Sequence, residues 1–295
     1  MKIGLIGLGY WGKIVLKNLA ELGFNDIIIC EQNYQNIDWA EIGSRYKVVK
    51  DYHHLRGRRK CDKIFVLTPA TTHYDICKFF LEKGTDVFCE KPLDISSSAC
   101  RKLYEIAKEN KASLFVDWIF TFNPAVNKIK SLIKEWGPPK NITANRMNYG
   151  PARNDVDAKW DLASHDVSIV CYLLEEYPGT VEWLDFKRDK DSIQNDSTVG
   201  VLSFEDTCVQ INASWSYGRK NRLYLFEFDD GILYWDDTIK SVKYGSLIND
   251  YALFDNADSI NIDNSSPLHN SIHSFLNKEA RQENLTLDVT SILEQ

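Results

Sequence analysis

The stretch that decides the fold is the N-terminal run MKIGLIGLGYWG, residues 1–12. Residues 3–6 form a short apolar run, which is typical of a buried β-strand. Residues 7–12 follow with three glycines in the order G-x-G-x-x-G, and a helical apolar pattern comes next. A strand, a glycine-rich turn and a helix in this order are typical of a dinucleotide-binding unit, because the turn brings backbone amides and a helix N-terminus to a pyrophosphate.

Each glycine of this turn has its own expected role. Gly7 permits the tight turn, Gly9 lets the backbone approach a pyrophosphate, and Gly12 lets the helix pack closely on the strand. We expect the cofactor to be bound by Gly7, Gly9, Tyr10, Trp11 and Gly12. A glycine turn that serves packing alone, or a methyltransferase loop, is the alternative interpretation.

Glu31 indicates which dinucleotide binds. It follows the apolar run 27–30 and lies nineteen residues after Gly12, close to the offset of about 20 residues expected for the carboxylate that binds the adenosine ribose. Its negative charge would repel the 2′-phosphate of NADP, and no arginine occupies the next three positions. We therefore predict NAD as the cofactor.

Strand and helix patterns alternate as far as residue 121. Further buried strands are expected at residues 27–30, 64–67, 86–89 and 114–116. Strands that are apolar on both faces and separated by helices indicate a parallel sheet covered on both sides. The sequence therefore predicts an α/β protein whose first domain, residues 1–121, is a doubly wound Rossmann domain.

The pattern changes after residue 121. Residues 207–215 alternate polar and apolar side chains, and residues 222–228 and 232–235 flank an Asp-Asp-Gly turn. Helices are expected at 124–135, 162–174 and 267–280. We expect a second, sheet-rich α/β domain over residues 122–295.

Composition narrows the range of partners. The chain has 35 basic and 42 acidic residues, a net charge of −7, and no apolar run near the ~20 residues of a membrane span. We expect neither nucleic acid nor a membrane as partner. The seven cysteines are scattered without a Cys-x-x-Cys pair, so we predict reduced thiols, a cytoplasmic protein and no metal site.

Lys91 is the first candidate catalytic residue. The tripeptide 90–92, Glu-Lys-Pro, follows the predicted strand 86–89. Ligands of open parallel sheets bind outside the carboxyl ends of the strands. An ammonium group at this place can hydrogen-bond and polarise a reacting C–O group. An exposed lysine before a loop proline is the alternative.

Asp161 and His165 form the second candidate. They are four residues apart in a predicted helix and share one face of it. A neutral imidazole accepts a proton at physiological pH, and a nearby carboxylate can orient it or the substrate. Asp166 points about 100° away around the helix, which suits a structural acid. The alternative is that Asp161 caps the helix and His165 is an ordinary half-buried histidine.

Four motifs in this order resemble the glucose-fructose oxidoreductase, inositol dehydrogenase and MocA (Gfo/Idh/MocA) family. They lie at residues 7–12, 68–73, 90–93 and 161–166. The resemblance covers most of the chain. It implies a Rossmann domain followed by an α/β domain with a large, open, mainly antiparallel sheet that mediates homodimers or homotetramers.

The resemblance also implies roles for individual residues. Thr68, Pro69 and His73 match the stretch along the nicotinamide side of the cofactor. Glu90 and Lys91 are counted with them among the cofactor-binding residues. Lys91 matches the lysine that contacts the reacting oxygen of the substrate. Asp161 and His165 match the pair that completes the site, with the histidine as acid or base.

Within the family, residues 160–166, 214–215 and 231–237 are most similar to a branch that acts on sugar nucleotides. Its members include UDP-N-acetylhexosaminuronate 3-dehydrogenases of bacterial surface-glycan biosynthesis. Two departures weaken the substrate assignment: the chain is shorter than many members, and residues 117–124 lack an arginine that some members carry before the phenylalanine.

The resulting expectation is an NAD-dependent dehydrogenase of a sugar, with a sugar nucleotide as the favoured substrate. The expected substrate-binding residues are Lys91, Arg153, Trp160, Asp161 and His165. The cations near the motifs, Arg146, Arg153, Lys159, Arg219 and Arg222, are candidate phosphate ligands. Alternatives are a free cyclitol or monosaccharide dehydrogenase, a ketosugar reductase, and a non-catalytic NAD-sensing regulator.

Overall fold

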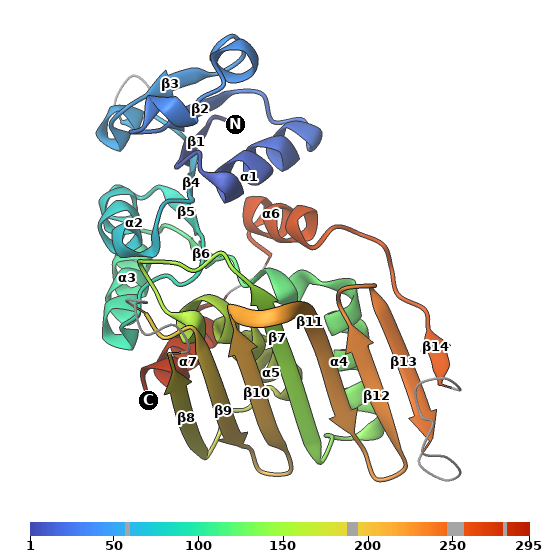
Figure 1. Cartoon of the computed structure of the whole chain (residues 1–295). Coiled ribbons are helices and arrows are strands. Elements are labelled where there is room, and N and C mark those ends of the chain that lie inside the picture. The colour runs from blue at the N-terminus through green and yellow to red at the C-terminus, as the bar shows by residue number, and fades with distance from the viewer. Residues whose placement is uncertain (57–59, 188–193, 247–256, 280–281) are drawn as a thin grey trace. The chain divides into compact units, whose positions relative to one another are not determined.

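The computed structural model describes residues 1–56, 60–187, 194–246, 257–279 and 282–295. These residues form two compact units (Figure 1): unit 1 is Met1–Ile119 with Ser266–Thr290, and unit 2 is Phe120–Ser265 with Ser291–Gln295. In the ranges so described, no helix has both the length and the apolar character needed to cross a membrane.

Unit 1 is built on a parallel sheet of six strands in the order β3-β2-β1-β4-β5-β6. The strands are β1 (Ile3–Ile6), β2 (Ile27–Cys30), β3 (Lys47–Val49), β4 (Lys63–Val66), β5 (Asp86–Cys89) and β6 (Leu114–Val116). The order reverses between β1 and β4, and ligands of such sheets bind at the carboxyl ends of the strands at this point. The predicted Rossmann sheet is confirmed, and β3 is a strand that the sequence pattern did not indicate.

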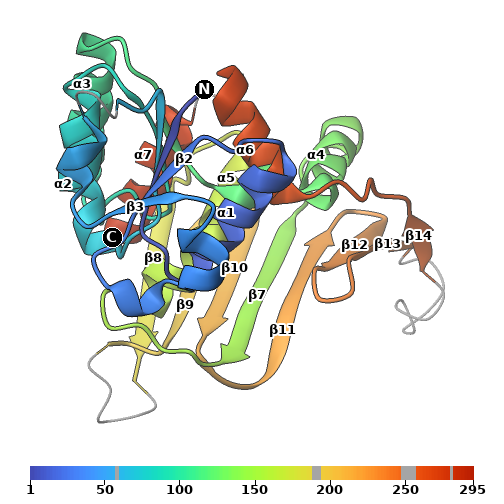
Figure 2. The same ribbon diagram turned by 90° about the horizontal axis from the view of Figure 1, so that it is seen from above.

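Helices cover both faces of this sheet. They are α1 (Tyr10–Glu21), α2 (His73–Leu81), α3 (Ser97–Glu109), α6 (Pro267–Asn277) and α7 (Glu283–Glu294). From above, α2 and α3 lie side by side on one face of the sheet, and α1 and α6 lie on the other (Figure 2). Short helical turns occur at Tyr34–Asn36, Trp39–Gly43, Tyr52–Leu55 and Ala70–Thr72.

The C-terminal segment belongs to the core of unit 1. The ring of Phe275 in α6 packs edge-on against Phe65 at 5.4 Å and against Phe88 at 5.6 Å. Ser271 in the same helix donates a hydrogen bond to the buried Asp117 after β6, at 2.5 Å. The units therefore differ from the expected pair, 1–121 and 122–295, in the placement of residues 266–290.

Unit 2 holds an eight-stranded sheet in the order β14-β13-β12-β11-β7-β10-β9-β8. Its strands are β7 (Asn141–Tyr149), β8 (Thr180–Phe186), β9 (Ser197–Ser203), β10 (Cys208–Ser214), β11 (Ser216–Glu227), β12 (Gly231–Asp236), β13 (Ser241–Ser246) and β14 (Asp258–Ile260). The pair β7–β10 is parallel and the other pairs are antiparallel. The expected large, mainly antiparallel sheet is confirmed.

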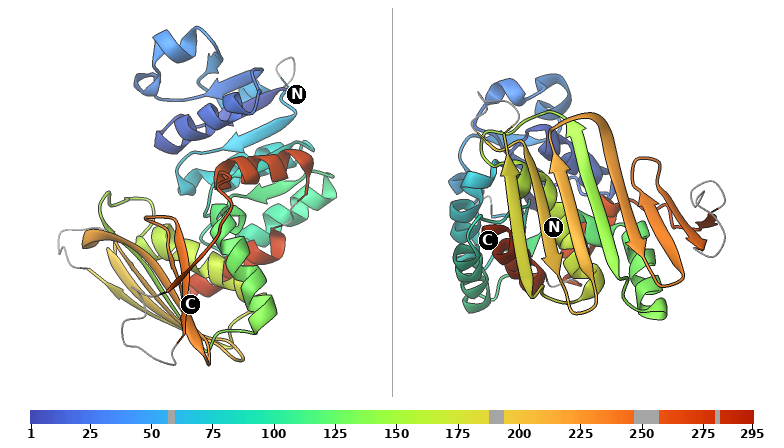
Figure 3. Two further views of the ribbon diagram at one scale, coloured as in Figure 1. Left: turned by 90° about the vertical axis from the view of Figure 1, so that its right-hand side faces the viewer. Right: turned by 60° about the horizontal axis from the view of Figure 1, so that its bottom comes forward.

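Helices of unit 2 cover one face of this sheet. They are α4 (Pro124–Trp136) and α5 (Ser164–Leu174), with helical turns at Ile119–Phe122 and Lys159–Ala163. The side chains that face them, such as Ile211 and Phe226, are buried. The opposite face is open, and Figure 3 shows it in the right-hand view.

Candidate active site

The glycine turn of unit 1 has the geometry that its sequence predicts. Gly7 has φ +93°, which favours glycine. A side chain on Gly12 would place its Cβ 2.1 Å from the carbonyl oxygen of Gly7, whereas a Cβ on Gly9 would meet nothing within 4 Å. Gly7 and Gly12 are therefore required by the turn itself, and the open space at Gly9 leaves the backbone accessible to a ligand.

The first turn of α1 is suited to an anion. Gly9 caps the helix without a side-chain hydrogen bond, and the first turn contains no acidic residue. Helix N-termini carry unpaired N–H groups and a partial positive charge. Tyr10, which is 85% exposed, and the half-buried Trp11 begin this helix. Their predicted contact with the cofactor stays a prediction.

Glu31 lies buried where β2 ends. Its two carboxylate oxygens accept hydrogen bonds from the backbone N–H of Leu8, at 2.7 Å, and of Asn33, at 2.8 Å. The carboxylate is therefore tied to the glycine turn. Each oxygen keeps lone-pair capacity for a ribose hydroxyl.

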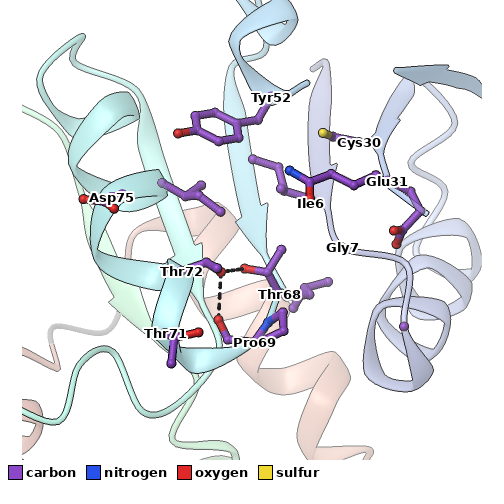
Figure 4. Close-up of a pocket in the computed structure, with 14 residues that line it drawn as sticks. Ile6, Gly7, Cys30, Glu31, Tyr52, Thr68, Pro69, Thr71, Thr72 and Asp75 are labelled. Carbon is purple, nitrogen blue, oxygen red and sulfur yellow. Dashed lines mark hydrogen bonds between the residues drawn. The ribbon is translucent and has the colours of Figure 1, made fainter. Parts of the chain in front are cut away.

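A cleft of about 550 Å³ lies against these residues (Figure 4). Of the residues predicted to bind the cofactor, Gly7, Gly9, Glu31, Thr68 and Pro69 line it. The hydroxyl oxygen of Thr72 lies within hydrogen-bond distance of Thr68 Oγ1, at 2.7 Å, and of the Pro69 carbonyl oxygen, at 2.8 Å, which closes the loop after β4. The cleft joins the glycine turn, the Glu31 carboxylate and this loop.

Sequence reasoning missed several residues that line the cleft. They are Gln32, Tyr52, Thr71, Thr72 and Asp75. Burial, with the nearby carboxylates of Asp75 and Asp51, raises the pKa of Tyr52. Tyr52 belongs to a short turn after β3 and Asp75 to α2. No local motif marks either residue, because only the fold brings their elements together.

Lys91 lies at the carboxyl edge of the same sheet. It follows β5, is 7% exposed, and its backbone N–H donates to Glu90 Oε2 at 2.8 Å. The backbone N–H of Glu90 donates to the Val66 carbonyl of β4. Lys91 therefore follows the strand beside the one whose loop lines the cleft, although it is not a lining residue itself. Its contact with a substrate stays a prediction.

His73 contacts backbone rather than the cleft. It is 1% exposed, and its two ring nitrogens lie 2.8 Å from the carbonyl oxygens of Pro92 and of Thr68. His73 is not among the residues that line the cleft. The structure thus places His73 against the backbone of the loop after β4, and its contact with the cofactor stays a prediction.

Asp117 is a second ionisable group at this edge of the sheet. It follows β6 and is fully buried, and its N–H donates to the Cys89 carbonyl of β5. Burial raises its pKa from the usual 3.8 to about 7, although a hydrogen bond from Ser271 acts against this change. No local sequence motif marks Asp117 as a site residue.

In unit 2, Asp161 is held by two donors. Arg153 Nη1 and Trp215 Nε1 each donate to a different oxygen of its carboxylate, both at 3.1 Å. Asp161 lies in the wide helical turn Lys159–Ala163, and His165 follows in the first turn of α5. The predicted helical segment is present, with a π-type turn at its start.

Arg153 differs from the expectation for a substrate-phosphate ligand. Its guanidinium forms two bonds to Asp155, at 2.9 and 2.6 Å, besides the bond to Asp161. Two carboxylates therefore neutralise it. The structure makes Arg153 a support for Asp161, and its contact with a substrate stays a prediction, as does that of the half-buried Trp160.

The start of α5 is anchored through Asp166. Arg146 Nε donates to Asp166 Oδ1 at 2.7 Å, and the Tyr224 hydroxyl donates to the same oxygen. Asp166 and Tyr224 are 0% exposed and Arg146 is 1% exposed. The guanidinium of Arg146 also lies 4.4 Å above the ring of Phe120, whose edge packs on His165 at 5.1 Å. The predicted structural role of Asp166 agrees with this geometry.

Among the described residues, no group of three or more His, Cys, Asp or Glu is arranged to hold a metal ion. The cleft offers a glycine turn, backbone amide donors and the Glu31 carboxylate. These residues fit a dinucleotide.

This chain resembles known proteins in both sequence and fold. Residues 1–118 match the sequence model of the family described as an oxidoreductase family with an NAD-binding Rossmann fold. An inositol 2-dehydrogenase of Rhizobium meliloti is 24% identical over 190 residues, which span 61% of this chain and 57% of that enzyme. The chain thus aligns with little more than half the length of this relative.

Solved structures cover nearly the whole chain. The UDP-N-acetylglucosamine 3-dehydrogenase of Acidithiobacillus ferrooxidans has a TM-score of 0.85 and 18% identity, and the match covers 99% of this chain and 95% of that one. A 3-ketoreductase from Actinomadura kijaniata, solved with TDP-benzene and NADP, has a TM-score of 0.83 and 17% identity over 100% and 96% of the two chains. Residues 1–118 therefore form a Rossmann domain of the Gfo/Idh/MocA oxidoreductase family, and the chain as a whole shares the fold of these solved oxidoreductases.

Proposed function

We propose that this protein is an NAD-dependent oxidoreductase that interconverts a ring hydroxyl and a ketone of a sugar. The observation that carries the proposal is the cleft in which the glycine turn meets the buried Glu31, with Lys91 on the adjoining strand edge. The family's oxidoreductases and the dehydrogenases among its relatives support this assignment.

NAD is preferred over NADP in this proposal. The residues lining the cleft include two carboxylates, Glu31 and Asp75, and no lysine or arginine among the lining residues that the structure describes. A 2′-phosphate needs a cation close to the ribose, whereas two hydroxyls need only acceptors.

The side chains divide the chemistry between them. The glycine turn and Glu31 would hold NAD, which would supply the acceptor for the hydride of the substrate carbon. His165 takes the proton of the reacting hydroxyl, and Lys91 stabilises the negative charge that develops on its oxygen. Asp161, fixed by Arg153 and Trp215, orients His165 or the substrate. A ketosugar reductase uses the same groups in reverse.

A sugar nucleotide is the first substrate class that we propose. Two similar proteins, a UDP-N-acetylglucosamine 3-dehydrogenase and a 3-ketoreductase solved with TDP-benzene, favour it. A role in surface-glycan biosynthesis in the cytoplasm would follow, and the seven free cysteines suit that reducing compartment.

A free sugar or cyclitol is the second candidate, and a specific observation favours it. Arg146 is fully buried, Arg153 is paired with Asp155 and Asp161, and Lys159 lies 3.6 Å from Asp185. Three of the five candidate phosphate ligands are thus engaged by carboxylates. Inositol dehydrogenases among the relatives point the same way.

We further propose a homo-oligomer formed through the open face of the unit 2 sheet. This face carries Leu184, Phe186 and Val201, which are 63%, 46% and 41% exposed. Neutral polar residues such as Gln210 and Asn212 continue it on β10. The charged Glu182 lies beside Val201, so the exposed apolar side chains form a patch within a mixed face. Exposed apolar side chains that cluster in this way are typical of interfaces between subunits.

Calorimetric titration with NAD(H) and NADP(H), followed by a substrate panel read at the NADH absorbance, tests the proposal. We expect tighter binding of NAD(H) and turnover on at least one sugar. Turnover on UDP-sugars alone would select the first substrate class, and turnover on inositol or free hexoses the second. Binding without turnover of any panel member would favour a regulator, and no binding of either dinucleotide would contradict the proposal.

A further inference from the structure

His73 forms two hydrogen bonds that a neutral histidine cannot make together. Its Nδ1 lies 2.8 Å from the Pro92 carbonyl oxygen, and its Nε2 lies 2.8 Å from the Thr68 carbonyl oxygen. Carbonyl oxygens only accept hydrogen bonds, and a neutral imidazole has a single N–H. Its other nitrogen would turn a lone pair toward an oxygen lone pair. Only the doubly protonated ring donates at both positions.

The two carbonyls belong to the two loops on which the candidate site depends. Thr68 lines the cleft in the loop after β4, and Pro92 directly follows Lys91 in the loop after β5. His73 itself begins α2, a third element. The ring is 1% exposed, so water does not compete for its donors. The His73 side chain therefore joins the loop after β4, which lines the cleft, to the loop after β5, which carries Lys91.

We propose that His73 is a positioning residue, held as an imidazolium cation, that fixes the Lys91 loop against the loop lining the cofactor cleft. The inference rests on the proposed function, in which this cleft binds NAD and Lys91 contacts the reacting oxygen. Displacements of about 1 Å in such groups cost about 100-fold in rate, so a link of this kind has a measurable effect on turnover.

Nuclear magnetic resonance tests the protonation state without any substrate. The chain has six histidines, so protein labelled with ¹⁵N in histidine gives a small set of ring signals, and the His73→Phe variant identifies those of His73. We expect both ring nitrogens of His73 to be protonated at neutral pH. A signal showing one unprotonated nitrogen would overturn the inference.

Two variants and a control test the positioning role. His73→Phe keeps a ring but removes both donors, and His73→Gln restores an amide donor. Phe80→Leu removes volume from the same helix at a buried site seven residues after His73. We expect His73→Phe to weaken NAD binding about 10-fold and to lower kcat by about 10- to 100-fold, with a smaller change in KM for the sugar. His73→Gln recovers part of both losses, and Phe80→Leu keeps wild-type values.

The outcomes separate this inference from the proposed function. If the wild-type protein binds no NAD, the proposed function fails. If the wild-type protein binds NAD but His73→Phe matches Phe80→Leu in NAD affinity, the cleft stands and the positioning role of His73 is overturned. Equal kcat values for these two variants would overturn it in the same way.

Discussion

At the scale of single residues, Glu31 shows how the fold prepares a ligand contact. The amides of Leu8 and Asn33 hold its two oxygens, and Leu8 itself belongs to the glycine turn. The carboxylate is thus oriented by the same backbone that would receive the pyrophosphate. A preorganised acceptor loses little conformational entropy when it binds a ribose.

Replacing Glu31 with Gln tests this contact. The amide keeps one acceptor oxygen but loses the charge and its second acceptor, and hydrogen bonds to charged groups contribute about 1.5–3 kcal/mol. We expect the Kd for NAD to rise about 10-fold and the preference over NADP to narrow, because the repulsion of the 2′-phosphate falls. Calorimetry measures both, with the exposed Glu109→Gln as control. An unchanged ratio of the two affinities would contradict the role of Glu31.

Asp117 is expected to make the stability of the folded protein depend on pH. Its pKa in the folded protein is about 7 against an ordinary 3.8, because it is buried. Between these values the unfolded chain ionises while the folded protein keeps the proton, so this group lowers the stability of the wild-type protein as pH rises. Below the ordinary pKa both states are protonated and the contribution vanishes.

Asp117→Asn removes this titration. We expect the variant to gain stability relative to wild type as pH rises from 4 to 7, with a ceiling of about 4 kcal/mol given about 1.4 kcal/mol per pKa unit. Urea unfolding at several pH values measures the difference, and the exposed Asp26→Asn is the control. A difference that stays constant over this range would show that Asp117 ionises normally in the folded protein.

At the scale of elements, the start of α5 is fixed by a buried ion pair. Arg146 of β7 and Tyr224 of β11 both donate to Asp166, next to His165. Buried ion pairs are poor sources of net stability but costly to break. The pair therefore sets where the helix begins on the sheet, and with it the position of His165.

Arg146→Met leaves the carboxylate of Asp166 buried without its cation. We expect a loss of about 3–5 kcal/mol in the free energy of unfolding, measured by urea denaturation, with the exposed Arg219→Met close to wild type. The double variant Arg146→Met with Asp166→Leu should lose less than the sum of the single changes. Strictly additive losses would show that the two side chains do not act as a pair.

The sequence predicted those elements whose signals are local. Residues 1–12 alone specify β1, the turn and the start of α1, because the glycines are needed within that segment. β3 was missed because it is an edge strand in which only Val49 is buried, so it lacks the continuous apolar run that marks the equally short β6. The return of α6 to unit 1 depends on Phe275 meeting Phe65 and Phe88, and contacts between residues so far apart leave no local pattern.

The same distinction holds for the candidate site. Lys91 was found from its place after a strand, and Glu31 from its spacing to the turn. The contact of Arg153 with Asp161 and the contribution of Tyr52 to the cleft depend on tertiary packing. The presence of an arginine near a motif therefore did not show whether its guanidinium is available to a substrate or is already paired with carboxylates of the protein.

At the scale of the whole molecule, the open face of the unit 2 sheet is the proposed contact between subunits. Val201→Lys places a charge at its apolar part, where an exposed valine lies on β9 between Glu182 and Gln210. We expect this variant to shift the protein toward monomer while its affinity for NAD is kept. Size-exclusion chromatography with light scattering measures the mass. Ile239→Lys, at a 70% exposed turn residue, is the matched control. A wild-type monomer, or an unchanged oligomer in Val201→Lys, would contradict the proposed interface.

The central claim is that this protein oxidises or reduces a sugar with NAD through Lys91. The most direct measurement compares wild type and Lys91→Met in two assays: NAD binding by calorimetry and turnover of the wild-type substrate at the NADH absorbance. We predict near-normal NAD binding and a loss of kcat of about 100-fold or more in the variant, since removing one stabilising donor costs about 10²–10³. Turnover of Lys91→Met at the wild-type rate would contradict the account.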